Sequence, residues 1–551
     1  MPAQVSNQRT APPGIPGGSG TQRDPSGQRP NAEGFQSILF DDLDPRTDVD
    51  GLKAPDCFAD LNLDQILETV TAGRDEYDLK PFFYAPLKDV VTIHYRHEVF
   101  RDLQKPLVHK SILAFAGEMQ RMRNYLAQGK KLYYEIQQRR LFLDAVEIYK
   151  NAVVKLTRDL AAATVTSLGL LDFREYLHAY TQSAEFEKLS AETERLKSDL
   201  SGIQYSLHIN GPRIVVHRYE SEEDYSTEVL RTFAKFSQGA AREYKFEIPF
   251  SLEMNHVEAA IVDRVQRLYP ETFAFLKEYC SRYAGYLDPV IARFDREVQF
   301  YIAVLDHMRR FTDAGLSFCF PTVTSESKEV LGSEAYDLAL ANQLLKQKKE
   351  VVVNDFYLKD PERIFIVSGP NQGGKTTFAH TFGQLHYLAS LGCPVPGTEA
   401  QLFHFDRIFT HFEREEDIQN LSGKLEDELL RIHHILESAT PRSILIMNES
   451  FLSTTLNDAL FLSRKILEKI IALDMLCVSV TFLDELASIS DTTVSMVSTV
   501  NPVDPAQRTF KVIRKPADGL AYAAAIAEKY HLTHDAIKKR IHRRTGEGET
   551  Q

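Results

Sequence analysis

The chain has 551 residues, 43% of them hydrophobic and 26% charged, and this length accommodates about three domains with sizeable cores. Its formal net charge of −13 argues against a protein that coats nucleic acid over its whole surface, although a local basic face remains possible. No apolar run approaches the roughly 20 residues that cross a bilayer, the N-terminus lacks a secretory signal, and the five cysteines form no CxxC pair. We therefore expect a cytoplasmic protein with reduced thiols, no membrane segment and no cysteine metal site.

The first 80 residues contain little that could form a core. Residues 1–34 include six Pro and six Gly among small polar residues, and this composition cannot offset the entropy lost on ordering. We predict a disordered tail over residues 1–35 and a connector over residues 36–80, in which residues 41–50 hold five Asp. A possible helix cap at Asp60 begins the ordered region.

Residues 81–330 are predicted to form a mainly helical region. Apolar residues recur there at helical spacing, with few breakers between about Pro81 and Thr312. The longest predicted helices suggest arms or levers, and they cover residues 111–128, 133–168 and 286–311. Residues 101–160 hold twelve Lys or Arg against six Asp or Glu, which a solvated helix face explains about as well as a phosphate-contacting surface does.

A short β segment interrupts this helical region. Tyr205–Ile209 and Ile214–Arg218 flank the strong turn signal Asn210-Gly211, so we predict a hairpin whose turn type is left open by Pro212. A β piece at the tip of long helices, within about residues 185–255, is how a reduced clamp would be built. An ordinary loop is an equally good alternative.

Residues 331–551 change to short apolar runs that alternate with helices, which predicts an α/β sheet covered by helices. The candidate strands are residues 364–368, 408–412, 444–447, 476–481 and 510–514. A fold of this kind places its ligands beyond the carboxyl ends of the strands.

A glycine-rich turn follows the first of these strands and opens a predicted helix. Backbone N–H groups in such a turn can point inward at an anion, and the helix dipole adds to the attraction. Lys375 would reach the β and γ phosphates, and the Thr376 hydroxyl would bind Mg²⁺. A plain glycine turn is the alternative, but it does not account for the Lys-Thr pair at this offset. The residues predicted to bind nucleotide here are Gly369, Pro370, Asn371, Gln372, Gly373, Gly374, Lys375, Thr376 and Thr377.

A second polar pair, Asn448-Glu449, follows the buried strand at residues 444–447. Asn448 and Thr376 are predicted to face the metal, although a neutral amide contributes no charge to a divalent ion that favours carboxylates. Glu449 is predicted to be the catalytic residue, as general base or water orienter. The pair could instead simply begin a turn.

These motifs resemble those of the MutS family of mismatch-repair ATPases. The resemblance is close over about residues 350–535 and looser over about 80–330. It rests on the following segments: Gly369 to Phe378, Gly392-Cys-Pro-Val-Pro396, Phe405-Asp-Arg-Ile-Phe-Thr410, Ile435-Leu-Glu-Ser-Ala-Thr440, Thr454-Thr-Leu-Asn-Asp458 and Asp295-Arg-Glu-Val-Gln-Phe300.

The resemblance implies a multidomain fold: a mainly α-helical core and lever region with a small β clamp, followed by an α/β P-loop ATPase domain of ABC type. It also implies ATP and Mg²⁺ as ligands, and a homodimer in which each ATPase domain closes the other's site. The serine that crosses over is expected near Ser422, with Gly423 at its usual place. Phe482 stands where the family carries a histidine that senses the γ-phosphate. Asn448, Gly423 and Phe482 each differ from the residue that the family carries at that position. We therefore expect tight ATP binding with slow hydrolysis, so that the protein is a weak ATPase used as a switch.

The family's mismatch-reading domain has no counterpart in the first 80 residues, so mismatch recognition is not expected. The resemblance leaves an ATP-switched clamp on duplex or branched DNA, a partner supported by family analogy alone. A different class is an ATP-gated dimerisation module whose partner is a protein, which would lack the steep salt dependence of phosphate binding. A small-molecule kinase is a third class, against which the long helical arms argue.

Overall fold

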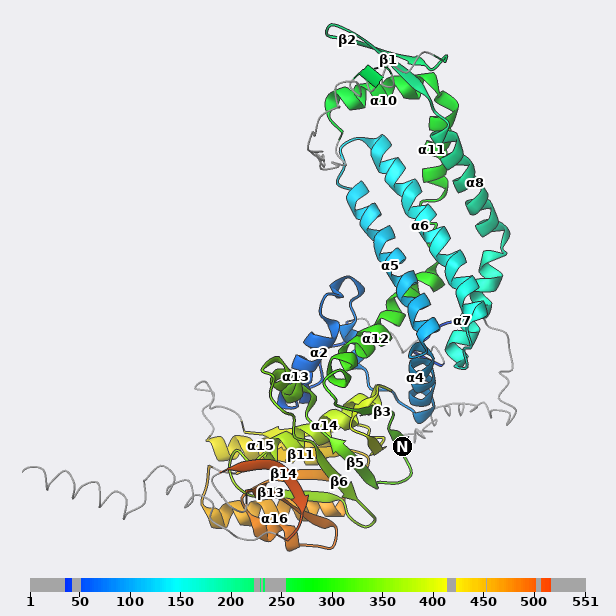
Figure 1. The fold of residues 1–551 in the computed structure, drawn as a ribbon. Coiled ribbons are helices and arrows are strands. Elements are labelled where there is room, and N and C mark those ends of the chain that lie inside the picture. Colours follow the sequence, from blue (N-terminus) through cyan, green and yellow to red (C-terminus); the bar gives the residue numbers. More distant parts are fainter. Residues whose placement is uncertain are drawn as a thin grey trace, which may run out of the picture.

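The computed structural model describes residues 35–41, 51–221, 228, 231–232, 254–413, 423–451, 453–501 and 507–516. Figure 1 shows an arm of long helices standing on an α/β domain, with a β-hairpin at the far end of the arm. This arrangement confirms a fold that combines a helical region with an α/β domain. Residues 1–34 of the tail predicted over 1–35, and residues 42–50 of the Asp-rich stretch predicted over 41–50, lie outside the described residues.

The arm is built from helices that pack along their length. Its first half contains α4 (Val90–Leu103), α5 (Pro106–Gly129), α6 (Glu135–Ala162), α7 (Leu168–Thr181) and α8 (Ala184–Ser201). Its second half contains α10 (His256–Leu268), α11 (Pro270–Arg282) and α12 (Pro289–Thr312). The apolar stripe of α5 and α6 faces inward, and α12 returns through the base of the arm to the α/β domain (Figure 1).

The helix predicted over residues 133–168 is present as α6, but it ends six residues earlier than predicted. The chain leaves α6 at Ala162 and begins α7 at Leu168. The buried carboxylate of Asp102 accepts the backbone N–H groups of Thr166 at 2.8 Å and Ser167 at 2.7 Å, and also the hydroxyl of Ser167 at 2.7 Å. These donors cannot serve a continuous helix, so a residue 64 positions earlier sets the break.

The hairpin at the tip consists of β1 (Tyr205–Asn210) and β2 (Arg213–Arg218), which confirms the predicted hairpin. Asn210 pairs with Arg213, so the two-residue turn is Gly211-Pro212 rather than Asn210-Gly211. Gly211 has φ +57°, and a glycine with positive φ in the first turn position is what a type II′ turn requires. Proline then fits the second position without losing a ladder hydrogen bond.

Residues 35–41 and the helices α1 (Cys57–Asp60), α2 (Leu63–Thr71) and η2 (Asp75–Tyr77) lie where the sequence predicts a tail end and a connector, and α3 (Lys80–Tyr84) opens the predicted helical region. The structure builds them into the core instead: Phe35, Ile38 and Leu39 are buried. Tyr301 of α12 donates to the carbonyl of Ile38 at 2.7 Å. Too few apolar residues occur in a row for composition to reveal this docking.

The α/β domain centres on a six-stranded sheet in the order β10-β11-β12-β7-β13-β14, in which only β14 runs antiparallel to its neighbour. The sequence predicts five of these strands to within a few residues. It does not reveal β13, in which four of the eight residues are Ser or Thr and no continuous apolar run marks the strand. The strands are β7 (Ile364–Ser368), β10 (Ile408–Phe412), β11 (Ile444–Asn448), β12 (Leu476–Val480), β13 (Thr493–Val500) and β14 (Arg508–Arg514).

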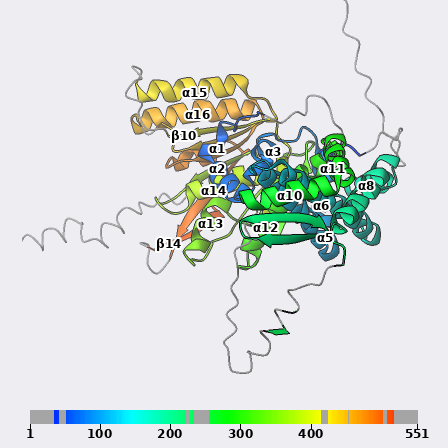
Figure 2. The same ribbon diagram turned by 90° about the horizontal axis from the view of Figure 1, so that it is seen from above.

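Helices cover both faces of this sheet. Phe365, Val367 and Ile446 pack on the side of α14 (Lys375–Ser390), whereas Ile366 and Leu445 pack on the side of α15 (Lys424–Ser438) and α16 (Leu456–Ala472). Figure 2 shows α15 and α16 as neighbours on their face. The turn η3 (Asp484–Ser488) follows β12.

The α/β domain also contains a second, four-stranded sheet and a two-stranded pair. The four strands run in the order β4-β9-β5-β6, and β3 pairs with β8. The elements of this part are β3 (Phe318–Cys319), β4 (Thr322–Thr324), β5 (Val330–Ala335), α13 (Leu338–Lys346), β6 (Asn354–Leu358), β8 (Val395–Pro396) and β9 (Glu399–Phe403).

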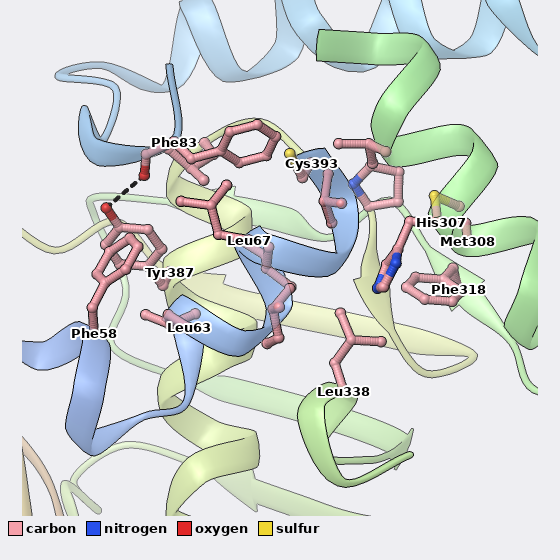
Figure 3. A pocket seen from close by; sticks show the side chains of 16 residues that line it. Phe58, Leu63, Leu67, Phe83, His307, Met308, Phe318, Leu338, Tyr387 and Cys393 are labelled. Carbon is pink, nitrogen blue, oxygen red and sulfur yellow. Dashed lines mark hydrogen bonds between the residues drawn. The ribbon is translucent and has the colours of Figure 1, made fainter. Parts of the chain in front are cut away.

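The arm and the α/β domain meet at the end of α14. Figure 3 shows apolar side chains of α2, α12 and α14 converging there, including Leu67, Met308 and Tyr387. The Tyr387 hydroxyl donates to the carbonyl of Phe83 at 2.9 Å. His307 of α12 is buried in the same junction, and burial lowers its pKa to about 4, so the imidazole is neutral at pH 7.

Candidate functional site

The glycine-rich turn joins β7 to α14 at the carboxyl edge of the main sheet. Gly369 has φ +116°, and Gly374, the N-cap of α14, has φ +98°, conformations that side chains rarely adopt. Gln372 also has positive φ, at +58°. The predicted turn between a buried strand and a helix N-terminus is therefore present, and its backbone is shaped by two glycines that no other residue would replace without strain.

Ser498 of β13 supports this turn from beneath. Its hydroxyl donates to the carbonyl of Gly373 at 2.7 Å. A Cβ at Gly373 would meet the Ser498 Oγ at 2.1 Å, and a Cβ at Gly369 would meet the Ser498 carbonyl oxygen at 2.8 Å. Sequence reasoning missed Ser498 because it missed β13. Ser498 is one of four Ser or Thr residues in this strand, so nothing in the sequence singles it out.

Lys375 is the first residue of α14 and its side chain is only 4% exposed. The ammonium turns back onto the loop and donates to the carbonyl of Gly369 at 2.9 Å and to Oδ1 of Asn371 at 3.3 Å. Burial lowers the pKa of Lys375, and the carboxylate of Glu449, 3.9 Å away, opposes that shift. The ammonium thus lies among weak acceptors, which it can exchange for an anion.

Phe482 covers the other side of this ammonium. The Lys375 Nζ lies 4.0 Å from the centre of the phenyl ring, within the range of a cation–π contact. The ring is 43% exposed, so it forms part of the surface over the loop. The structure therefore places Phe482 beside the loop, as the sequence predicts, and gives the ring a contact that sequence reasoning did not foresee.

Thr376 and Asn448 are brought together as predicted. The Thr376 hydroxyl donates to Oδ1 of Asn448 at 3.0 Å. Both oxygens are hard ligands of the kind that Mg²⁺ takes, so the pair fits such an ion, although neither carries a charge. Within the described ranges no group of three or more His, Cys, Asp or Glu side chains could hold a metal by itself. Water and the oxygens of a bound anion would complete the coordination.

Glu449 follows β11 in a left-handed conformation, with φ +53°. Its N–H donates to the carbonyl of Val480 at 2.9 Å, which ties the turn to the end of β12. The carboxylate faces Lys375, so the loop, Asn448, Glu449 and Phe482 converge at the ends of β7, β11 and β12. Parallel strands bring these residues to one edge, although up to 113 positions separate them.

The structure describes one of the two residues predicted for the crossing segment. Gly423 is exposed and is the N-cap of α15, and no described atom outside its own chain neighbours lies within 4 Å of the place that a Cβ would take. Ser422 lies outside the described residues. Thr377 lies in the first turn of α14, and Pro370 lies within the loop.

The fold and the site together define the class of protein. It has a long helical arm on an α/β domain, and the glycine turn and Lys-Thr pair of that domain are suited to a phosphate-bearing ligand. Residues 365–539 match the family model described as MutS domain V. The α/β part of the chain is therefore similar to domain V of the MutS family.

Similar proteins carry mismatch-repair names. The chain is 22% identical to the DNA mismatch repair protein MSH3 of Kluyveromyces lactis over 437 residues, which cover 70% of this chain and 41% of that protein. It is 25% identical to the DNA mismatch repair protein MutS of Chlorobium chlorochromatii over 243 residues, 43% of this chain and 28% of that protein. It is 35% identical to MutS of Thermosipho melanesiensis over 100 residues, 18% of this chain and 12% of that protein. The chain thus spans less than half the length of these relatives.

Among the described residues no helix is long and apolar enough to cross a membrane.

Proposed function

We propose that the chain is a MutS-like, ATP-dependent DNA-binding protein that acts as an ATP-switched dimeric clamp with slow hydrolysis. The observation that carries this proposal is the convergence of Lys375, Thr376, Asn448 and Glu449 on one strand edge beside a glycine turn. The match of residues 365–539 to MutS domain V and the similarity to mismatch-repair proteins support ATP as the nucleotide and DNA as the partner.

Nucleotide binding would use groups that the loop already presents. The N–H groups at the start of α14 and the Lys375 ammonium would take the phosphate oxygens, with Lys375 exchanging the Gly369 carbonyl for them. Thr376 and Asn448 would hold Mg²⁺, which supplies charge neutralisation of the phosphates when bound. Glu449 would orient the attacking water and accept its proton.

Slow hydrolysis follows from what the site lacks. Asn448 contributes no charge to the metal, Gly423 carries no hydroxyl, and Phe482 has no hydrogen-bond donor. Removing one charge-stabilising donor costs about 3 to 4 kcal/mol in enzymes where it has been measured, whereas binding depends mainly on the loop and Lys375. We therefore infer that ATP acts on this protein chiefly by occupying the site.

DNA binding would use the arm and its hairpin. Of the twelve basic residues between 101 and 160, eight lie in ion pairs: Lys105, Arg121, Arg123, Arg139, Arg140, Lys150, Lys155 and Arg158. The exposed ones among these pairs contribute only about 0–1 kcal/mol and can be exchanged for phosphate contacts, whereas Lys105 and Arg123 also pair with the buried carboxylates of Asp102 and Asp295. The pairing nevertheless favours the second candidate, an ATP-gated module that binds protein. A steep loss of DNA retention with rising salt would separate the first from the second.

Sedimentation of wild type and Lys375→Ala, with and without Mg·ATP and a branched DNA, tests the proposal. Wild type should sediment as a dimer with ATP and should retain the DNA, whereas Lys375→Ala should stay monomeric because the phosphates lose their only lysine contact in the loop. Lys349→Ala, which removes an exposed lysine from the same domain, is the matched control. A monomeric wild type that fails to retain labelled ATP with Mg²⁺ would overturn the proposal.

A further inference from the structure

The turn that carries Glu449 is strained. Glu449 has φ +53° and Phe451, two residues on, has φ +64°. Left-handed conformations cost a non-glycine residue of order 1 kcal/mol or more, so such a turn persists only if its surroundings hold it. Phe451 is buried, which fixes its side chain but does not by itself select the backbone conformation.

Glu428 of α15 supplies one of the holding contacts. Its Oε2 accepts the backbone N–H of Phe451 at 3.0 Å, at the second strained position. The carboxylate is buried, and burial raises the pKa of Glu428. A buried acceptor that reaches from one helix to the turn of another element is expensive to lose, because the Phe451 N–H would then be left without this partner.

His411 at the end of β10 completes the arrangement. Its Nε2 lies 3.3 Å from the Glu428 carbonyl oxygen, and its Nδ1 lies 3.0 Å from the Ser450 Oγ. A carbonyl can only accept, so Nε2 carries the proton and the Ser450 hydroxyl donates to Nδ1. The residues on either side of Ser450 are the two strained ones. The Ser450 hydroxyl thus reaches the backbone carbonyl of Glu428 through His411, whereas the Glu428 side chain holds the turn at Phe451.

Glu428 also stands close to the start of its helix. α15 begins at Lys424 with Gly423 as its N-cap, so Glu428 lies five residues from Gly423, or roughly 7 Å along the helix axis. Gly423 is where the proposed dimer would bring a contact from the opposite nucleotide. A rigid helical turn therefore joins the proposed crossing point to the turn that bears the proposed general base.

We propose that Glu428 is the positioning residue for Glu449: it fixes the Glu449–Phe451 turn and links its geometry to the segment that reaches the opposite site. This inference rests on the proposed function, since it needs a bound nucleotide on which Glu449 acts. Glu428 does not touch the nucleotide, so it should affect the cleavage step and not nucleotide affinity.

The test compares Glu428→Ala with Glu428→Gln, whose amide oxygen can still accept the Phe451 N–H. We would measure the dissociation constant of a fluorescent ATP analogue and the single-turnover rate of ATP cleavage. Glu428→Ala should slow cleavage tenfold or more with affinity within twofold of wild type, and Glu428→Gln should recover most of the rate. Glu426→Ala, which alters an exposed residue of the same helix, should change neither quantity.

Several outcomes would overturn the inference. Unchanged cleavage in a folded Glu428→Ala protein would show that the turn holds without Glu428. Equal losses in the Ala and Gln variants, together with lost affinity and a lower unfolding midpoint, would show a general structural role. If wild type binds the analogue but never cleaves ATP, Glu428 has no positioning role, but the protein still binds nucleotide. If wild type does not bind the analogue, the proposed function is wrong as well.

Discussion

At the scale of single residues, the site is recognisable from a few side chains whose neighbours the sequence does not reveal. The Lys-Thr pair and Asn448-Glu449 could be located from motif and strand order alone. Ser498 and Glu428 could not be located in this way. Their roles depend on which strand lies against the glycine turn and which helix lies against the Glu449–Phe451 turn. A buried Ser or Glu carries no periodic signal that distinguishes it from an ordinary polar residue.

Phe482→His tests whether the missing donor limits hydrolysis. The histidine would place an N–H near the phosphates, and we expect single-turnover cleavage to rise tenfold or more, since one such donor is worth that much elsewhere. Phe482→Leu removes the ring from Lys375 without adding a donor and serves as the control; it should leave cleavage unchanged. Because the ring is largely a surface group, both variants should fold. Equal cleavage rates in wild type and both variants would show that Phe482 does not limit hydrolysis and would point to Asn448 or Gly423 instead.

Glu297 of α12 should give stability a measurable pH dependence. Burial raises its pKa from 4.5 to about 7, although the N–H of Ile38 and the hydroxyl of Ser37 favour the charged form. The folded state therefore holds a proton that the unfolded state releases, and this stabilisation is complete below about pH 4.5 and is lost as pH rises through about 7. Its full size is about 3 kcal/mol.

Glu297→Gln cannot titrate, so its free energy of unfolding should fall less steeply than that of wild type over the same pH range. Denaturant unfolding at closely spaced pH values measures the two slopes. Asp295, whose pKa burial raises to about 6, remains in the variant and should keep a smaller part of the slope. Parallel curves for the two proteins would rule out Glu297 as the source.

At the scale of elements, long periodic helices and buried strands were predictable, and their interruptions were not. The break between α6 and α7 depends on Asp102, which belongs to a different helix. The hairpin was predictable because its turn residues are adjacent in sequence. The docking of residues 35–41 was not, because its partners lie on α4 and α12, more than 50 positions away.

Asp102→Ala should lower the free energy of unfolding by about 2 to 4 kcal/mol, because it leaves the N–H groups of Thr166 and Ser167 without their acceptor. Asp102→Asn keeps an acceptor and should lose less. Burial alone would raise the pKa of Asp102, yet hydrogen bonds from Lys105, Ser167 and Thr166 hold it at about 2. Its stabilisation is therefore present above about pH 4 and is lost as pH falls through about 2. Denaturant unfolding checks the order of the variants.

At the scale of the whole molecule, the sequence predicted a helical region followed by an α/β domain, and the structure has both. It did not predict how they are joined, because the joint is made by single side chains from distant segments. Arg96 of α4 is the centre of that joint. Its guanidinium donates to the carbonyl of Leu39 at 2.9 Å and to that of Leu391, just beyond α14, at 2.8 Å, and it lies 5.1 Å from the ring of Phe300.

The docking of residues 35–41 sets where the folded body starts. A chain shortened to begin at Gly51 would keep every helix and strand that the structure describes, yet it would uncover Arg96 and Glu297 and take away the carbonyl and N–H groups that satisfy them. Two ionisable groups would then face an open groove at the foot of the arm. A chain that begins near the first helix would thus lose buried contacts of the core, so we expect the shortest stable form of this protein to include residues from Phe35 onward.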